Sequence, residues 1–156
     1  LYDIGVVPVE EPFKKVVHQG MILNNGQKMS KSLGNVISPD GYDHDELRFY
    51  LMFLGPYTDG GSWTDNGLVG VQRFIKKIKA WIEQEDGEET LDFESFEKRI
   101  FDYNDKFKFN KIVSEFMILY NNNKNKKINS ETKDKIINLL EIYMPTIKNK
   151  IHTWSK

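Results

Sequence analysis

Two lysines three positions apart lie in a short serine-containing segment that could bind the phosphates of a nucleotide. Residues 28 to 32 read Lys-Met-Ser-Lys-Ser and stand between Gly26 and Gly34. Lys28 and Lys31 carry compact ammonium groups on flexible stems, which suits them to pair with phosphate oxygens as point charges. The two serine hydroxyl groups add hydrogen-bond donors, and the glycines let the backbone bend sharply. The segment therefore predicts a mobile loop that closes over a nucleotide.

Such a loop suits a reaction that displaces a phosphate-containing leaving group from a nucleotide. Negative charge builds on the phosphoryl oxygens and on the leaving group, and cationic side chains lower the barrier by stabilising that charge. A bare pair of lysines is mostly a solvated surface feature. The complete pentapeptide is different, because it arises by chance in a chain of this length about once in ten thousand sequences.

Composition and charge restrict the class of protein. The 156 residues are 39% hydrophobic and 29% charged, which is enough for one domain or two small ones. Cysteine is absent, which excludes disulfides and Cys-based zinc sites. The histidines, His18, His44 and His152, lack the spacing of metal ligands, so the sequence predicts no metal site.

Charge and hydropathy also bear on partners. The net charge of −1 predicts that any contact with RNA is local rather than spread over the surface. The sequence has no signal peptide and no apolar run of membrane length, which predicts a cytoplasmic protein without a membrane partner. The first residue is Leu rather than Met, so we expect the chain to be a piece of a longer protein.

The segments around the lysine loop predict a strand, a turn and a helix. Residues 20 to 23 are apolar or small, which favours a short buried strand. Residues 24 to 26, Asn-Asn-Gly, are a strong turn signal. After the loop, Pro-Asp-Gly at 39 to 41 marks a break, and the pattern of 45 to 54 predicts a helix that Gly-Pro at 55 to 56 ends.

The second half of the chain predicts helices. Apolar residues recur at steps of three and four along 68 to 82, 93 to 120 and 136 to 144, which is the period of an amphipathic helix. An acidic linker at 83 to 89 and an Asn- and Lys-rich stretch at 121 to 129 separate them, and we expect the latter to be an exposed loop. Three or four such helices predict a small bundle. Its aromatic residues could stack RNA bases, but their position beside aliphatic residues favours core packing.

The loop and its flanks together resemble the leucyl-tRNA synthetases, which are class I aminoacyl-tRNA synthetases. Methionyl, isoleucyl and valyl enzymes share the motif Lys-Met-Ser-Lys-Ser-Leu-Gly-Asn, so the flanks carry the distinction. Isoleucyl and valyl enzymes usually have His-Gly where this chain has Gln19-Gly20. The segments that follow the leucyl pattern, in order, are 1–5, 11–13, 19–23, 53–56 with Trp63, 67–74 and, more loosely, 107–114.

The resemblance implies an α+β fold that is mostly α. Residues 1 to 64 are expected to be the C-terminal part of a Rossmann-type catalytic domain with the lysine loop. Residues 65 to 156 are expected to be the helical bundle of the anticodon-binding domain, which docks tRNA. The resemblance implies that the complete enzyme activates leucine with ATP and Mg²⁺ to leucyl-adenylate and transfers it to tRNA(Leu).

The resemblance also assigns site residues. Lys28 and Lys31 are expected to be catalytic, and the strand at Gln19-Gly20-Met21 is expected to flank the adenine pocket. The expected ATP-binding residues are Gln19, Gly20, Met21, Lys28, Met29, Ser30, Lys31 and Ser32. Clustered charge makes Arg73, Lys76, Lys77 and Lys79 candidates for contacts with tRNA phosphates, against the alternative of a solvated helix face.

The sequence departs from the family pattern in three ways. The His-Ile-Gly-His motif of class I enzymes is absent, so we expect the remainder of the synthetase to supply it as a partner and the 156 residues alone to be inactive. Asp43 stands where the family has glycine, and residues 145 to 149 replace a Pro-His pattern in the final helix. The alternative functions are a non-catalytic RNA-binding or assembly module and a methionyl, isoleucyl or valyl enzyme.

Overall fold

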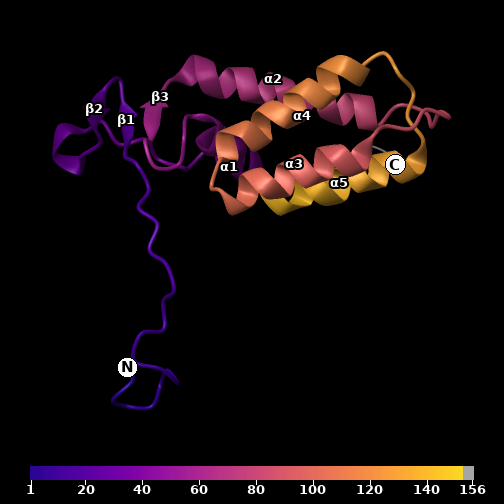
Figure 1. Cartoon of the computed structure of the whole chain (residues 1–156). Coiled ribbons are helices and arrows are strands. Elements are labelled where there is room, and N and C mark those ends of the chain that lie inside the picture. The colour runs from indigo at the N-terminus through magenta and orange to yellow at the C-terminus, as the bar shows by residue number, and fades with distance from the viewer. Residues whose placement is uncertain (153–156) are drawn as a thin grey trace.

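The structure is a computed structural model that describes residues 1–152. It is an α+β fold that is mostly helical, as the sequence predicted, with a three-stranded sheet at one end and packed helices at the other (Figure 1). None of the helices within these residues is long and apolar enough to cross a membrane. The elements are β1 (Ile22–Asn24), β2 (Gln27–Lys28), the 3₁₀ helix η1 (Lys31–Leu33), α1 (His44–Phe53), β3 (Gly61–Trp63), α2 (Asp65–Ile82), α3 (Phe93–Asp105), α4 (Phe109–Asn123), α5 (Ser130–Tyr143) and α6 (Ile147–His152).

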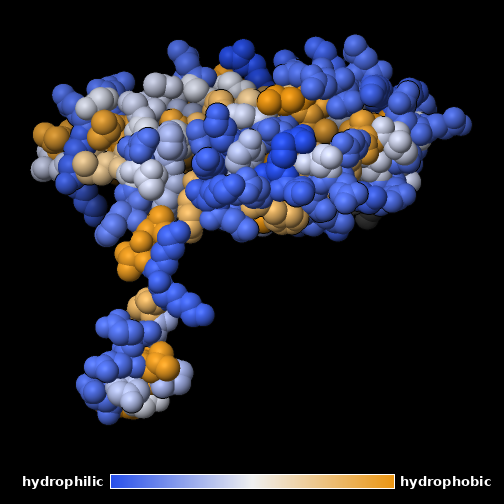
Figure 2. All heavy atoms as spheres, in the orientation of Figure 1, coloured by the Kyte–Doolittle hydropathy of each residue, from blue (hydrophilic) through white to orange (hydrophobic). Residues whose placement is uncertain are grey.

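The residues before β1 form an arm that runs away from the rest of the molecule and ends in a turn (Figure 1). Its apolar side chains are largely exposed, and Phe13 and Val16 are 81% and 72% exposed. Figure 2 shows hydrophobic atoms along this arm and at the end of the molecule that carries the sheet. Apolar surface of this kind marks places where other polypeptide packs.

The sheet has β1 at its centre, antiparallel to β2 and parallel to β3. The predicted turn between β1 and β2 is confirmed. Asn25 and Gly26 have φ angles of 50° and 75°, and a tight hairpin turn requires such positive values. The predicted buried strand at 20 to 23 is displaced, since β1 spans Ile22–Asn24 and is only half-buried. Gly20 instead donates its N–H to the carbonyl of Tyr57, at 2.8 Å, outside the regular ladder.

The helices surround one hydrophobic core, and α1 belongs to it. Phe49 of α1 is fully buried and stacks on Phe74 of α2, with ring centroids 6.2 Å apart. It also lies 6.2 Å from the ring of Phe116 on α4. The helix that follows the lysine loop is thereby fixed to the helices of the second half of the chain.

The prediction of an exposed loop at 121 to 129 is wrong in part. Helix α4 continues to Asn123, and Ile128 is 1% exposed. The stretch pairs with the acidic linker, because Gly87 donates its N–H to Ile128 O at 3.0 Å and Asn129 donates to Glu89 O at 3.0 Å. The side chain of Asn129 then caps α5 by accepting from Thr132 N.

Candidate functional site

The two lysines of the motif lie at the exposed end of the sheet. Lys28 is the last residue of β2, and Lys31 begins η1, which Gly34 ends in a left-handed conformation with φ 64°. Both lysines are exposed. Met29 between them is partly buried and packs against the hydrophobic core, so it attaches the loop to the body of the molecule.

Asn35 holds the backbone of the loop in one shape. Its Oδ1 accepts a hydrogen bond from Ser30 N at 2.8 Å, and its Nδ2 donates to Lys28 O at 3.1 Å. The carbonyl of Asn35 accepts from Nδ2 of Asn24, at 2.8 Å, which ties the loop to the end of β1. The loop therefore has a defined backbone although its lysine side chains are free to move.

The lysine charges in this loop are available to an anion. Among residues 1–152, neither Lys28 nor Lys31 forms an ion pair with a carboxylate. The hydroxyl groups of Ser30 and Ser32 lie 2.7 Å apart and hydrogen-bond to each other. The two ammonium groups and the two hydroxyl groups can therefore donate hydrogen bonds to a phosphate.

The roles of Asn24 and Asn35 were missed from the sequence. Asn35 was noted only as part of the motif and Asn24 only as part of a turn. A signal was present, since short amide side chains near tight turns often hydrogen-bond to nearby backbone groups. The sequence could not show that both residues would act on the same loop, because Asn24 lies at the end of β1, before the hairpin, and Asn35 follows η1.

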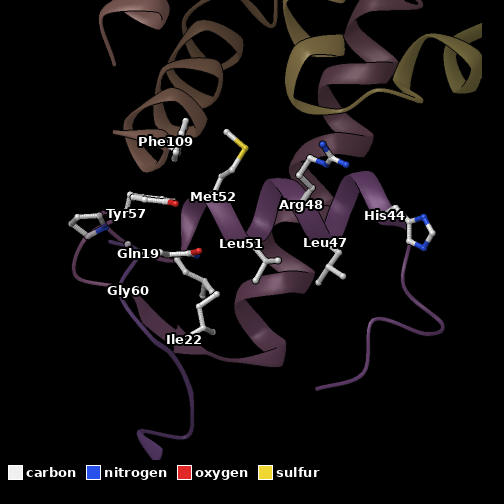
Figure 3. A pocket seen from close by; sticks show the side chains of 13 residues that line it. Gln19, Ile22, His44, Leu47, Arg48, Leu51, Met52, Tyr57, Gly60 and Phe109 are labelled. Carbon is white, nitrogen blue, oxygen red and sulfur yellow. The ribbon is translucent and has the colours of Figure 1, made fainter. Parts of the chain in front are cut away.

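The predicted segment Gln19-Gly20-Met21 crosses the backbone of the loop before β3. A Cβ atom on Gly20 would lie 2.0 Å from Gly60 N, so the crossing requires glycine. Gln19 is exposed, and Met21 is 60% exposed. Gln19 lines a cavity of about 400 Å³ along α1, whose walls include none of residues 28 to 32. Figure 3 shows Gln19 on the same side of this cavity as Ile22 and Tyr57.

The four candidate tRNA contacts all lie on α2 but do not share one environment. Arg73 and Lys77 are exposed and one turn apart. Lys76 and Lys79 line a cavity of about 190 Å³ together with carboxylates of α1. Within the described part of the chain none of the four forms an ion pair.

Known proteins resemble this chain in sequence and in fold. The family model for class I tRNA synthetases (I, L, M and V) matches residues 6–64. The leucine–tRNA ligase of Malacoplasma penetrans (strain HF-2) is 35% identical over 97% of this chain. The leucine–tRNA ligase of Mycoplasmopsis pulmonis (strain UAB CTIP) is 40% identical over 78% of this chain. The chain spans 20% and 17% of the lengths of these two relatives.

A solved structure supports the fold. It is the ternary complex of Agrobacterium radiobacter K84 agnB2 LeuRS with tRNA and LeuAMS, and the similarity covers 96% of this chain and 24% of that one. The TM-score is 0.71 at 22% sequence identity, so this likeness concerns the fold alone. The family model and the two relatives, whose identity extends over 97% and 78% of the chain, show that the chain belongs to the leucyl-tRNA synthetase family, as the sequence predicted.

Proposed function

We propose that the chain is part of a leucine–tRNA ligase, which joins leucine to AMP from ATP and then transfers it to tRNA(Leu). The observation that carries the proposal is the loop at 28 to 32, in which Lys28 and Lys31 are exposed, lack an ion pair within residues 1–152 and extend from a backbone fixed by Asn35. The two leucine–tRNA ligases support leucine over methionine, isoleucine or valine, which the family model also covers.

In this proposal Lys28 and Lys31 bind the phosphates of ATP and stabilise the charge of the departing pyrophosphate. Ser30 and Ser32 donate hydrogen bonds once a phosphate oxygen replaces their mutual contact. Exposed ammonium groups fit an anionic ligand, and Mg²⁺ would arrive with the phosphates, since it retains several waters and binds largely through substrate oxygens. Residues 19 to 21, Gln-Gly-Met, and Met29 would contribute to the walls of the nucleotide site.

The proposal assigns the two halves of the chain to different tasks. Residues 1 to 64 belong to the Rossmann-type catalytic domain, which the match of the family model to 6–64 supports. Residues 65 to 156 form the tRNA-docking helical domain, and the last four of them lie outside the described residues. The cytoplasm is the proposed place of action.

The remainder of the synthetase is the proposed partner. The relatives are several times longer than this chain, and the arm before β1 exposes apolar side chains that another part of a larger protein would cover. That part would carry the His-Ile-Gly-His motif and meet the triphosphate from the side opposite to the lysine loop.

The clamp made by Asn35 can be tested in the complete synthetase. Asn35→Ala removes both side-chain hydrogen bonds to the loop backbone and should slow leucyl-adenylate formation by roughly tenfold, because Lys28 and Lys31 lose their fixed starting points. The measurement is the single-turnover rate with ATP and leucine, with the exposed Asn138→Ala as the matched control. An unchanged rate for Asn35→Ala would show that the backbone shape does not matter.

The tRNA-docking role can be tested through salt dependence. Replacing Arg73, Lys76 and Lys77 with Gln should weaken cognate and non-cognate tRNA binding alike and lower the slope of log K against log salt by up to about 3. Filter binding over a range of salt concentrations measures the slope, and adenylate formation serves as the control that should not change. A slope identical to that of the unchanged enzyme would mean that these residues form a solvated helix face and do not contact tRNA phosphates.

A further inference from the structure

The beginning of α1 and the last helix meet in a charged network. Asp45, in the first turn of α1, is 4% exposed, and its Oδ2 accepts hydrogen bonds from Thr146 N at 3.0 Å and Thr146 Oγ1 at 2.6 Å. The ammonium group of Lys150 on α6 lies 3.3 Å from the same oxygen. It also donates to both carboxylate oxygens of Asp43, at 2.7 and 2.6 Å. The two partners of each of these bonds are more than 100 positions apart in the chain, and Asp45 and Thr146 are 101 positions apart.

Asp43 performs a second task in this network, because it is the N-cap of α1. Its Oδ1 accepts from the backbone N–H of Asp45 at 3.0 Å and of Glu46 at 3.2 Å. An N-cap satisfies amide groups that a helix leaves unpaired at its first turn. The carboxylate that starts α1 is therefore the same one that binds Lys150.

The surroundings favour the charged forms of this pair. Burial acts to raise the pKa of Asp43, but the hydrogen bond from Lys150 and the backbone N–H of Glu46 outweigh it, and the pKa lies below its usual value. Burial acts to lower the pKa of Lys150, but the hydrogen bond that it donates to Asp43 and the negative charge of Asp45 outweigh this effect, and that pKa is raised. Asp43, Asp45 and Lys150 line the cavity of about 190 Å³ described above, and the other charged groups that line it are Glu46, Lys76 and Lys79.

The sign of each shift shows the pH range in which the network contributes. The depressed pKa of Asp43 adds stability above its ordinary pKa of 3.8, which is lost as the pH falls through the lower value of the folded state. The raised pKa of Lys150 adds stability below its ordinary pKa of 10.5, which is lost as the pH rises through the higher folded value. Near neutral pH both contributions are complete.

The network stands at the end of the segment that leads out of the lysine loop. That segment, 36 to 42, connects Asn35 of the loop clamp to Asp43. Ile37 and Tyr42 within it pack against the core, and the ring of Tyr42 lies 5.8 Å from that of Trp63. The start of α1 therefore fixes the C-terminal end of this segment, whose other end is Asn35 of the loop.

We propose that Thr146 and Lys150 are positioning residues for the lysine loop: by binding Asp43 and Asp45 they fix the start of α1, and with it the segment that holds the loop in register for ATP. Neither residue touches the reacting groups. The inference rests on the proposed leucine activation, and it gives the last helix a part in the chemistry at the other end of the fold. The purely structural alternative is that the network only adds stability.

The test uses two measurements on Lys150→Met, with Lys148→Met as the matched control. Lys148 lies on the same helix and is exposed, and its partner, the half-buried Glu141, is 3.7 Å away. In the 156-residue chain, Lys150→Met should speed hydrogen exchange of the Asp45, Glu46 and Thr146 amides by about tenfold or more, and Lys148→Met should not. In the complete synthetase, the single-turnover rate of leucyl-adenylate formation should fall by roughly 10- to 100-fold for Lys150→Met alone.

The single-turnover rate constant does not depend on the fraction of enzyme that is folded, so a loss of stability alone leaves it unchanged. Lys150→Arg should restore most of the rate. If Lys150→Met fails to fold, Asp43→Asn takes its place as the test variant, because it keeps a cap oxygen but removes the charge. It should then show the faster amide exchange and the lower rate that are expected for Lys150→Met. Unchanged amide exchange, or faster exchange with a full single-turnover rate, would overturn the proposal. Lys31→Ala in the same assay separates the two claims, because an unchanged rate for Lys31→Ala would count against leucine activation by this loop itself.

Discussion

Replacing Lys31 with alanine in the complete synthetase is expected to slow leucyl-adenylate formation by roughly 10²- to 10³-fold, which is the usual cost of removing one preorganised charge that stabilises a transition state. Lys31 is exposed at the start of η1 and has no carboxylate partner within residues 1–152. In the proposed function its charge stabilises the pyrophosphate that departs from ATP. Single-turnover formation of the adenylate is the measurement.

The control for this prediction is Lys98→Ala, which removes an exposed lysine from α3. Leucine binding should change little for Lys31→Ala, because the loop is proposed to bind the phosphates rather than the amino acid. Equal losses in leucine binding and in the rate would indicate a misfolded enzyme. A decrease of less than about threefold would be incompatible with a catalytic role for Lys31.

Gly20→Ala is expected to lower the free energy of unfolding by about 3 kcal/mol, near the upper end for a single substitution that overpacks a site. The added Cβ would lie 2.0 Å from Gly60 N and 2.2 Å from the carbonyl carbon of Asp59. Both are backbone atoms, which cannot rotate aside as a side chain can. Urea denaturation of the chain measures the loss.

Gly70→Ala is the matched control for this crossing and should change stability in the opposite direction. Gly70 lies inside α2, and a Cβ there has no heavy atom within 4 Å. Alanine in a helix interior should raise the free energy of unfolding by roughly 0.5 to 1 kcal/mol. Equal effects at Gly20 and Gly70 would show that the close approach at Gly20 does not exist in solution.

The helices were predictable because their apolar residues repeat along the sequence. The predicted helix at 45 to 54 is α1, His44–Phe53, and the predicted face from 68 to 82 is the buried face of α2. A repeat of this kind depends only on residues a few positions apart, so a single sequence contains it. The hairpin turn at Asn25-Gly26 was predictable for the same local reason.

The errors arose where distant segments meet. Ile128 is buried because the Asn- and Lys-rich stretch pairs with the acidic linker, and no periodic pattern reports such a pairing. Lys133, 7% exposed, is paired with Asp86 of that linker at 2.7 Å, and no local pattern in the sequence shows this pairing. Asp45 would be read as an ordinary first-turn acid, and its burial depends on Thr146 and Lys150 at the far end of the chain.

The candidate site was predictable in part. The motif located Lys28 and Lys31, but the lysines alone gave no account of what holds the loop. The clamp by Asn35 depends on the fold of the hairpin, which brings Asn24 and the loop backbone together. Gln19 was expected near the nucleotide, and it lines a cavity along α1 that the loop residues do not share.

The central claim is that this chain supplies the phosphate-binding side of a leucine-activating site. The most direct test is leucine-dependent exchange between pyrophosphate and ATP, measured for the 156-residue chain alone, for the polypeptide that precedes it in a synthetase, and for the two together. We predict exchange only for the mixture, and its loss when the chain carries Lys31→Ala. Leucine-dependent exchange by the chain alone, or full exchange by the mixture with Lys31→Ala, would contradict the claim.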